Sequence, residues 1–132
     1  ESDFYAPEIH LIAGRYLLFY SARTAKGNHC LGVAVSSDGH ADALYVSASA
    51  VDEPLLCLPP GDVIDPSVFI QRTSEGSTPY LLYKDGNRWP WHPWRTSIYI
   101  QRLRDDGLAL IGEGQLLLSP RPFSWEANSI AG

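Results

Sequence analysis

An internal repeat of about sixty residues is the feature that most restricts how this chain can fold. The stretch "APEIHLIAGRYLLFYSA" (6–22) aligns with "DPSVFIQRTSEGSTPYLLYKD" (65–85), and "LGVAVSSDG" (31–39) aligns with "SIYIQRLRDDG" (97–107). The offset is 59 residues at Pro7 and Pro66 and grows to 68 at the Asp-Gly pairs. Such drift is expected where loops of repeated units differ in length, so the chain is predicted to contain two copies of one structural unit.

Each copy has the pattern of four short strands separated by Gly-, Asn- and Asp-rich turn signals. The runs "YLLFY" and "YLLY" are apolar on both faces, as a sheet between two other sheets requires. Four strands in about sixty residues are typical of one β-propeller blade. We therefore predict an all-β chain, a β-propeller segment of about two four-stranded blades. The strands are expected at 8–12, 15–21, 30–37, 43–48, 67–72, 79–84, 96–103 and 113–118.

The predicted organisation is a single partial propeller domain over 1–132. Its blade-like repeats are 4–58 and 62–120, and 121–132 is the start of a further blade. Two blades do not close a ring, because known propellers have about four to eight. The chain also lacks Met. Both observations lead us to expect that it is a segment of a larger propeller.

Composition narrows the range of partners. Hydrophobic residues make up 45% of the chain, which excludes disorder, and the formal net charge of −5 does not favour nucleic acid. No apolar run of about 18 residues is present, so no membrane-spanning segment is expected. Cys30 and Cys57 are the two cysteines. They could form a disulfide or remain two buried thiols, and composition does not decide between these.

An Asp-Pro pair stands out in "DVIDPSVF" (62–69). Proline is tolerated at the first residue of a strand, and the residue before it is pushed towards an extended conformation. Asp65 is therefore expected in extended backbone at the start of an inner strand, at the mouth of the central channel. The alternative is that Asp65 only caps the turn after "PPG" (59–61), since turn Asp residues are common.

These motifs together resemble glycoside hydrolase family 43. The resemblance rests on "FYAPEIH", "GRYLLFYSA", "LGVAVSSDG", "IDPSVF", "TPYLLYKDGN" and "TSIYIQRL", in order along nearly the whole chain. It implies a five-bladed β-propeller that hydrolyses arabinose- or xylose-containing plant polysaccharides with inversion. It also implies a polysaccharide or oligosaccharide substrate, an extracellular location and no cofactor for the chemistry. The family often holds a structural cation in the channel, with its ligands expected outside this segment.

The resemblance assigns Asp65 to the carboxylate that orients the general acid and modulates its pKa. Inverting glycosidases need one carboxylate to activate water and one carboxyl group to protonate the leaving oxygen. A third carboxylate about 6 Å away repels the acid's charge by about 2–3 kcal/mol, roughly two pKa units. The family's base comes from a first blade that this chain lacks. Aligning "SWEANSIAG" with the family pattern puts the acid position on Ala131, whereas a shifted register makes Glu126 the acid.

Aromatic residues are candidate sugar contacts. Tyr5 precedes "AP", where the family often has an aromatic wall, although a core aromatic between blades is an equal alternative. The loop "GNRWPWHPWRT" (86–96) contains Trp89, Trp91 and Trp94, which either stack on sugar faces or bury themselves against the blade. His10 is expected to face a strand neighbour rather than a metal. The turn positions 85, 105 and 106 are expected to hold solvated Asp residues.

Three functions follow from these patterns. The first is an inverting glycosidase, of which this segment would be inactive alone because it lacks the base. The second is a non-catalytic carbohydrate-binding or degenerate propeller, which Ala131 favours. The third is a protein-interaction propeller, which would need no channel carboxylate such as Asp65.

Overall fold

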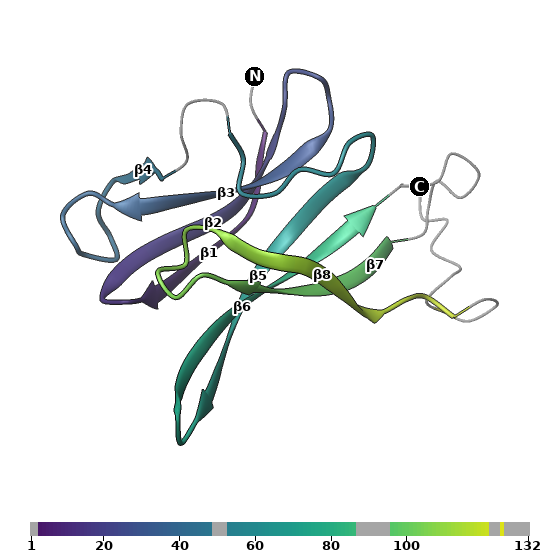
Figure 1. Cartoon of the computed structure of the whole chain (residues 1–132). Helices are drawn as coiled ribbons and strands as arrows, with labels where there is room; N and C mark the ends of the chain where they lie inside the picture. Colours follow the sequence, from purple (N-terminus) through teal and green to yellow (C-terminus); the bar gives the residue numbers. More distant parts are fainter. Residues whose placement is uncertain (1–2, 49–52, 87–95, 122–124, 126–132) are drawn as a thin grey trace.

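A computed structural model of the chain describes residues 3–48, 53–86, 96–121 and 125 (Figure 1). These residues form two four-stranded antiparallel sheets, and no α-helix occurs among them. The same residues therefore hold no helix that could cross a membrane. The all-β prediction and the two four-stranded units are confirmed.

Strand order follows chain order in both sheets. The first sheet contains β1 (Phe4–Ile12), β2 (Arg15–Arg23), β3 (His29–Ser36) and β4 (Tyr45–Ser47). The second sheet contains β5 (Asp62–Thr73), β6 (Gly76–Gly86), β7 (Thr96–Leu103) and β8 (Leu110–Leu118). Each sheet is a meander of antiparallel neighbours, and two-residue turns join β1 to β2 and β5 to β6.

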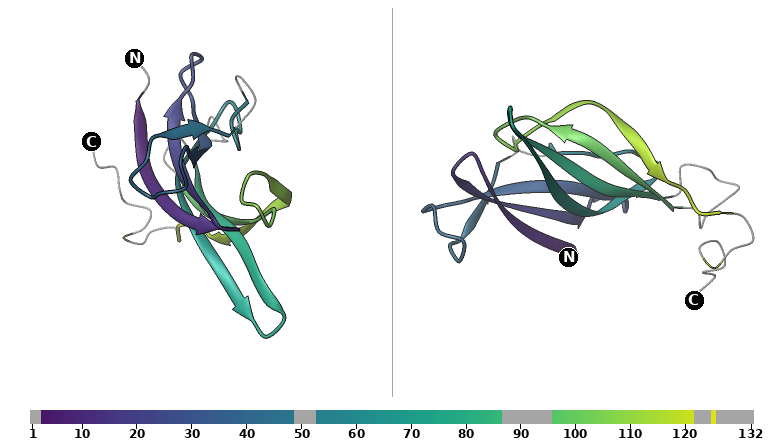
Figure 2. Two further views of the ribbon diagram at one scale, coloured as in Figure 1. Left: turned by 90° about the vertical axis from the view of Figure 1, so that its left-hand side faces the viewer. Right: turned by 90° about the horizontal axis from the view of Figure 1, so that it is seen from below.

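The two sheets share one hydrophobic core. β5, the edge strand of the second sheet, lies against β1, β2 and β3 of the first. The two sheets twist past one another, and the β5–β6 hairpin extends away from the body of the molecule (Figure 2). The buried core side chains are Ile12, Leu17, Phe19, Leu31, Val33, Val63, Leu81, Tyr83 and Leu103.

β1 and β5, the first and inner strand of each sheet, both carry a β-bulge at the Xaa-Pro pair. The pairing register shifts between Tyr5 and Glu8 in β1 and at the equivalent place in β5. In each bulge the residue before proline has a left-handed backbone, with φ of 47° at Ala6 and 57° at Asp65. The expectation that Asp65 is extended is therefore wrong. A bulge of this kind places its first residue in the left-handed region, where Asp is among the better tolerated side chains.

Asp65 also lies within a strand and not at its start. β5 begins at Asp62 and continues past Pro66 to Thr73. Proline has no N–H for the ladder, and a bulge is one of the few places in a strand that accepts it. The prediction of a strand at 67–72 was therefore too short, because the bulge lets pairing continue on both sides of the proline.

The two Asp-Gly turns of the repeat are built alike. Gly39 and Gly107 both have a positive φ, of 84° and 75°. A Cβ at Gly107 would lie 2.5 Å from Leu17 Cδ1, so this turn packs tightly on the first sheet. Its Asp106 accepts hydrogen bonds from the Arg104 guanidinium and the Leu108 amide, which hold the pKa of that carboxyl below its usual value.

Asp85 corrects another expectation. It lies in β6 and is only 6% exposed, so it is not a solvated turn residue. It occupies the same face of β6 as the core residues Leu81 and Tyr83, because alternate residues of a strand share a face.

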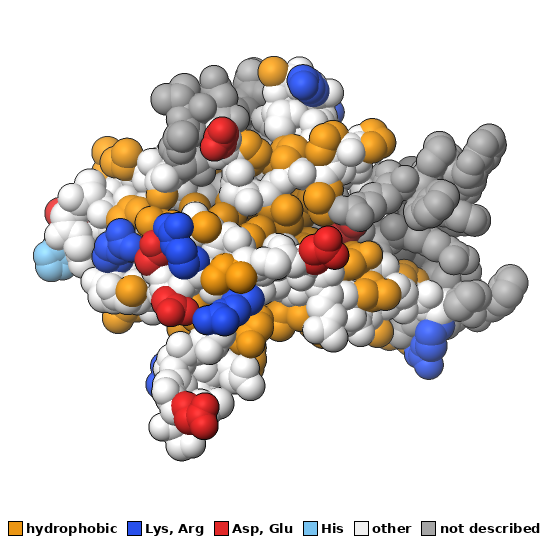
Figure 3. Space-filling view, viewed as in Figure 1, with side chains coloured by type: hydrophobic (Ala, Val, Ile, Leu, Met, Phe, Trp, Pro, Cys, Tyr) orange, Lys and Arg blue, Asp and Glu red, His pale blue; other side chains and the backbone are white. Residues whose placement is uncertain are grey.

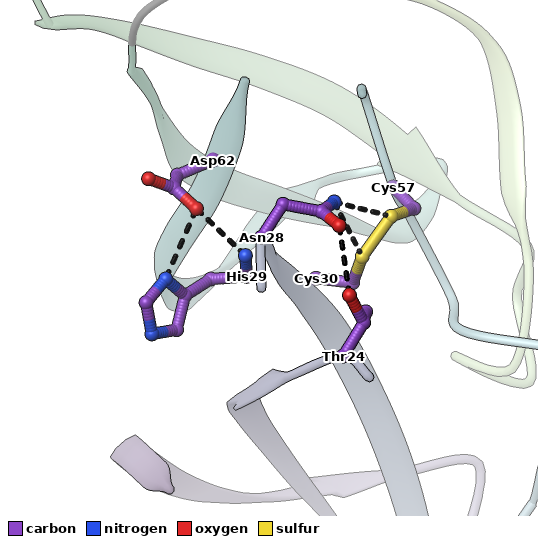
Figure 4. Close-up of a disulfide and its surroundings, with 6 residues drawn as sticks. All are labelled: Thr24, Asn28, His29, Cys30, Cys57 and Asp62. Carbon is purple, nitrogen blue, oxygen red and sulfur yellow. Dashed lines mark hydrogen bonds and ion pairs between the residues drawn. A yellow bond between two sulfur atoms is a disulfide. The ribbon is translucent and has the colours of Figure 1, made fainter. Parts of the chain in front are cut away.

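The segment between the sheets is fixed to β3 by a disulfide. Cys30 of β3 bonds to Cys57 (Figure 4). The adjacent Leu31 pairs with Leu56 through two backbone hydrogen bonds. The disulfide closes a loop with a sequence separation of 27 residues. It thereby ties the first sheet to the segment that leads into β5.

Large apolar side chains remain exposed on β1 and β8, an edge strand of each sheet. On β1 and β8 they are Phe4, Tyr5, Ile9, Leu11, Ile111, Leu116, Leu117 and Leu118. Hydrophobic side chains are spread over the face on which β8 lies (Figure 3). Exposed apolar surface of this kind is typical of surfaces that contact other parts of a protein or a partner.

Candidate functional site

Asp65 is the centre of the candidate site. Its backbone is held in the left-handed region within the β5 bulge. Its amide donates a hydrogen bond of 3.1 Å to the hydroxyl of Ser21, a fully buried residue of β2. Asp65 does not use its carboxylate to cap the "PPG" turn. Instead, Oδ2 lies 2.8 Å from the Lys84 ammonium, which comes from β6.

Side chains of the first sheet bond β5 at Asp65 and just after it. Ser21 accepts the Asp65 amide, and Glu8 Oε2 accepts the Val68 amide at 3.0 Å. Glu8 Oε1 also accepts a hydrogen bond of 3.4 Å from the Ser67 hydroxyl. An edge strand otherwise presents unpaired backbone groups, so these contacts fix the bulge against the first sheet.

Tyr5 lies beside this arrangement. It pairs across the β1–β2 ladder with Ser21, the residue that binds Asp65. Its ring contacts the His29 imidazole edge-on, with centroids 5.4 Å apart, and His29 in turn binds Asp62 through both its backbone amide and Nδ1 (Figure 4). Tyr5 is 47% exposed, so an aromatic surface remains open near the Asp65 bulge.

His10 behaves as the sequence predicts. Its Nε2 lies 3.1 Å from Glu8 Oε1, a neighbour on the same strand. The described residues contain no group of three or more His, Cys, Asp or Glu side chains that could hold a metal ion. The ligands of the channel cation that the resemblance implies are expected outside this segment, and no step of the chemistry below uses a cation.

Other predicted site residues lie outside the described part of the chain. These are Trp89, Trp91, Trp94, Glu126 and Ala131. Their roles stay predictions. Conversely, sequence reasoning missed Ser21 and Lys84. No local pattern indicated either contact, because Ser21 reaches Asp65 from the other sheet and Lys84 reaches it across the β5–β6 pairing.

The chain forms two adjoining four-stranded antiparallel sheets, and the first strand of each sheet is bulged. This is the arrangement of blades in a β-propeller. A comparison with protein-family models identifies the family within this class. Residues 1–130 match the model of the glycosyl hydrolases family 43, and the chain belongs to that family. The family resemblance of the sequence motifs is thereby confirmed.

Two solved structures are similar to this chain. One is a thermostable family-43 glycoside hydrolase, with 28% sequence identity and a TM-score of 0.70 over 90% of this chain and 36% of that chain. The other is an endo-arabinase from Bacteroides thetaiotaomicron, with 26% identity and a TM-score of 0.68 over 89% of this chain and 38% of that chain. This chain thus spans little more than a third of either. No curated protein sequence matches it.

Proposed function

We propose that this chain is the part of an inverting glycoside hydrolase that supplies the carboxylate next to the general acid. The substrate class is an arabinose-containing plant polysaccharide. Family membership supports the reaction class, and the similar endo-arabinase supports the sugar. The observation that carries the proposal is Asp65, a carboxylate held on a left-handed bulge of the inner strand and 51% exposed at its side chain.

The proposed reaction needs three carboxyl groups. A base removes a proton from water, whose oxygen attacks the anomeric carbon while the bond to the leaving oxygen breaks. The general acid gives its proton to that oxygen. Asp65 neither gives nor takes a proton. Its negative charge opposes ionisation of the acid, and its oxygens orient it.

Three further points belong to the same proposal. Tyr5 contributes an apolar face to the sugar site, together with the Trp residues of 86–96. Neither nucleic acid nor a membrane is proposed as a partner, since the chain is acidic. The protein acts outside the cell, and the Cys30–Cys57 disulfide supports an oxidising location.

The test compares wild-type and Asp65→Asn forms of the whole protein that contains this segment. Substrates are an aryl arabinofuranoside, an aryl xyloside and linear arabinan. We expect arabinoside hydrolysis by the wild type and a fall in kcat of about 10²-fold or more in Asp65→Asn. Asp105→Asn is the matched control, because Asp105 is an exposed, ion-paired carboxylate in the turn between β7 and β8. Equal activity of wild type and Asp65→Asn would contradict the role of Asp65.

Residues 1–132 alone form the second arm of this experiment. We expect no turnover above background, since inversion requires a base that this chain does not supply. Turnover that disappears in Asp65→Asn would instead identify Glu126 as the acid. A non-catalytic carbohydrate-binding propeller is the competing function, favoured by Ala131 at the aligned acid position. It predicts that the whole protein binds arabino-oligosaccharides in calorimetry but releases no sugar.

A further inference from the structure

We propose that Lys84 is a positioning residue for Asp65, whose carboxylate it holds in the orientation needed to act on the general acid. This inference rests on the proposed function. The Lys84 ammonium lies 2.8 Å from Asp65 Oδ2, the distance of a charge-assisted hydrogen bond. Lys84 comes from β6, so the contact crosses from one strand to the next at the bulge.

The first repeat provides an internal control for this contact. Register pairs Tyr5 with Ser21 in β1–β2 and Ile64 with Lys84 in β5–β6, so Ser21 and Lys84 are equivalent positions. In the same frame Asp65 is equivalent to Ala6, and both residues have a positive φ. The first repeat therefore forms the same bulge with two uncharged side chains. The backbone does not require the ion pair, which the second repeat adds to a geometry already stable without it.

The backbones on both sides of the ion pair are fixed. The Asp65 amide is held by the buried Ser21 hydroxyl. Lys84 stands between Tyr83 and Asp85, whose side chains are both buried on the opposite face of β6. What remains free to rotate is the partly exposed Asp65 carboxylate, and the ammonium selects one of its orientations. Lys84 thus supplies the part of the geometry that the backbone leaves open.

Stability does not explain the pair. The side chains of Lys84 and Asp65 are 35% and 51% exposed, and ion pairs this exposed contribute little to folding. A role in orientation therefore predicts that loss of Lys84 leaves the melting temperature nearly unchanged while it slows the reaction. A merely structural role predicts the reverse.

The experiment is a double-mutant cycle in the whole protein with Asp65→Asn, Lys84→Gln and both together. Alone, Lys84→Gln should lower kcat on linear arabinan about tenfold and leave KM unchanged, since only assistance to the leaving group is impaired. In the Asp65→Asn background the same substitution should have no further effect, because Lys84 acts through Asp65. Lys84→Arg keeps the charge and should recover most of the activity.

A leaving-group series gives an independent reading. Aryl arabinofuranosides with strongly acidic phenols need little protonation, so Lys84→Gln should slow them less than about threefold. The loss should grow as the phenol becomes less acidic. Arg102→Gln is the matched control, because Arg102 of β7 forms a more exposed ion pair, with Asp105, in the same half of the molecule. It should change neither kcat nor the leaving-group dependence.

The outcomes separate the two proposals. If Asp65→Asn is fully active, or if the wild type releases no sugar, the proposed function fails and this inference fails with it. If Asp65→Asn is impaired while Lys84→Gln matches the wild type on all leaving groups, this inference alone is overturned. The same holds if the two substitutions are additive in the cycle.

Discussion

β1 and β5 are the same strand of the repeat in two different surroundings. Phe4 and Val63 occupy equivalent positions, yet Phe4 is 66% exposed and Val63 is fully buried. Pro7 is likewise exposed where Pro66 is buried. The difference is that Val63 and Pro66 of β5 lie against the first sheet, whereas the described residues leave Phe4 and Pro7 of β1 exposed. The side chains at this end of the first strand of a sheet are thus buried by the neighbouring sheet and not by the strands of the same sheet.

The same comparison separates the backbone conformation that both bulges share from the charged side chains that only one bulge carries. Ala6 and Asp65 share the left-handed backbone before proline, so the bulge belongs to the fold. Asp65 and Lys84 carry charge where Ala6 and Ser21 do not, so the ion pair belongs to one repeat alone. The second repeat therefore carries a charged pair on a bulge that the first repeat forms with uncharged side chains.

The largest expected effect contrasts Val63→Asp with Phe4→Asp. At Val63 the carboxylate would be buried without a partner, at a cost of about 3–5 kcal/mol in the free energy of unfolding. At Phe4 the side chain is exposed, and the loss is that of its edge contact with Tyr20, about 1 kcal/mol. Urea unfolding of both variants measures the difference. Equal costs would mean that β1 is covered as β5 is.

Removal of the disulfide should have the next largest effect. Cys30→Ala combined with Cys57→Ala frees the segment that leads into β5, and loss of a loop closure of this length costs about 2–4 kcal/mol. Because the segment borders the second sheet, hydrogen exchange should accelerate in β5 more than in β1. The unfolding midpoint with and without a thiol reductant checks the size, and an unchanged midpoint would show that the bond does not hold the sheets together.

Ser21→Ala tests the contact that docks the bulge. The substitution leaves the Asp65 amide without its buried acceptor, which should cost about 1–2 kcal/mol. Ser21→Thr keeps the hydroxyl and is the control for loss of the hydrogen bond. Thermal unfolding of the three proteins gives the comparison. If Ser21→Ala is as stable as the wild type, the amide finds water and the first sheet does not fix the bulge.

Much of this fold was readable from the chain. The repeat, the turn signals and the apolar strand runs predicted two four-stranded antiparallel sheets, because these depend on local periodicity and short-range turn chemistry. The family motifs placed the candidate carboxylate at Asp65. The bulge itself was not predicted, since steric rules for a residue before proline favour extended backbone and the ladder on both sides overrides them.

The sequence by itself determined the two four-stranded units, the equivalence of Pro7 with Pro66 and the family. Only the tertiary structure decided that Cys30 bonds to Cys57, that Asp85 is buried and that Ser21 and Lys84 both meet Asp65. The reason is the separation along the chain of the residues that interact. Strand and turn signals act between residues close in the chain, whereas Ser21 and Asp65 are 44 residues apart and meet only because the second sheet packs on the first.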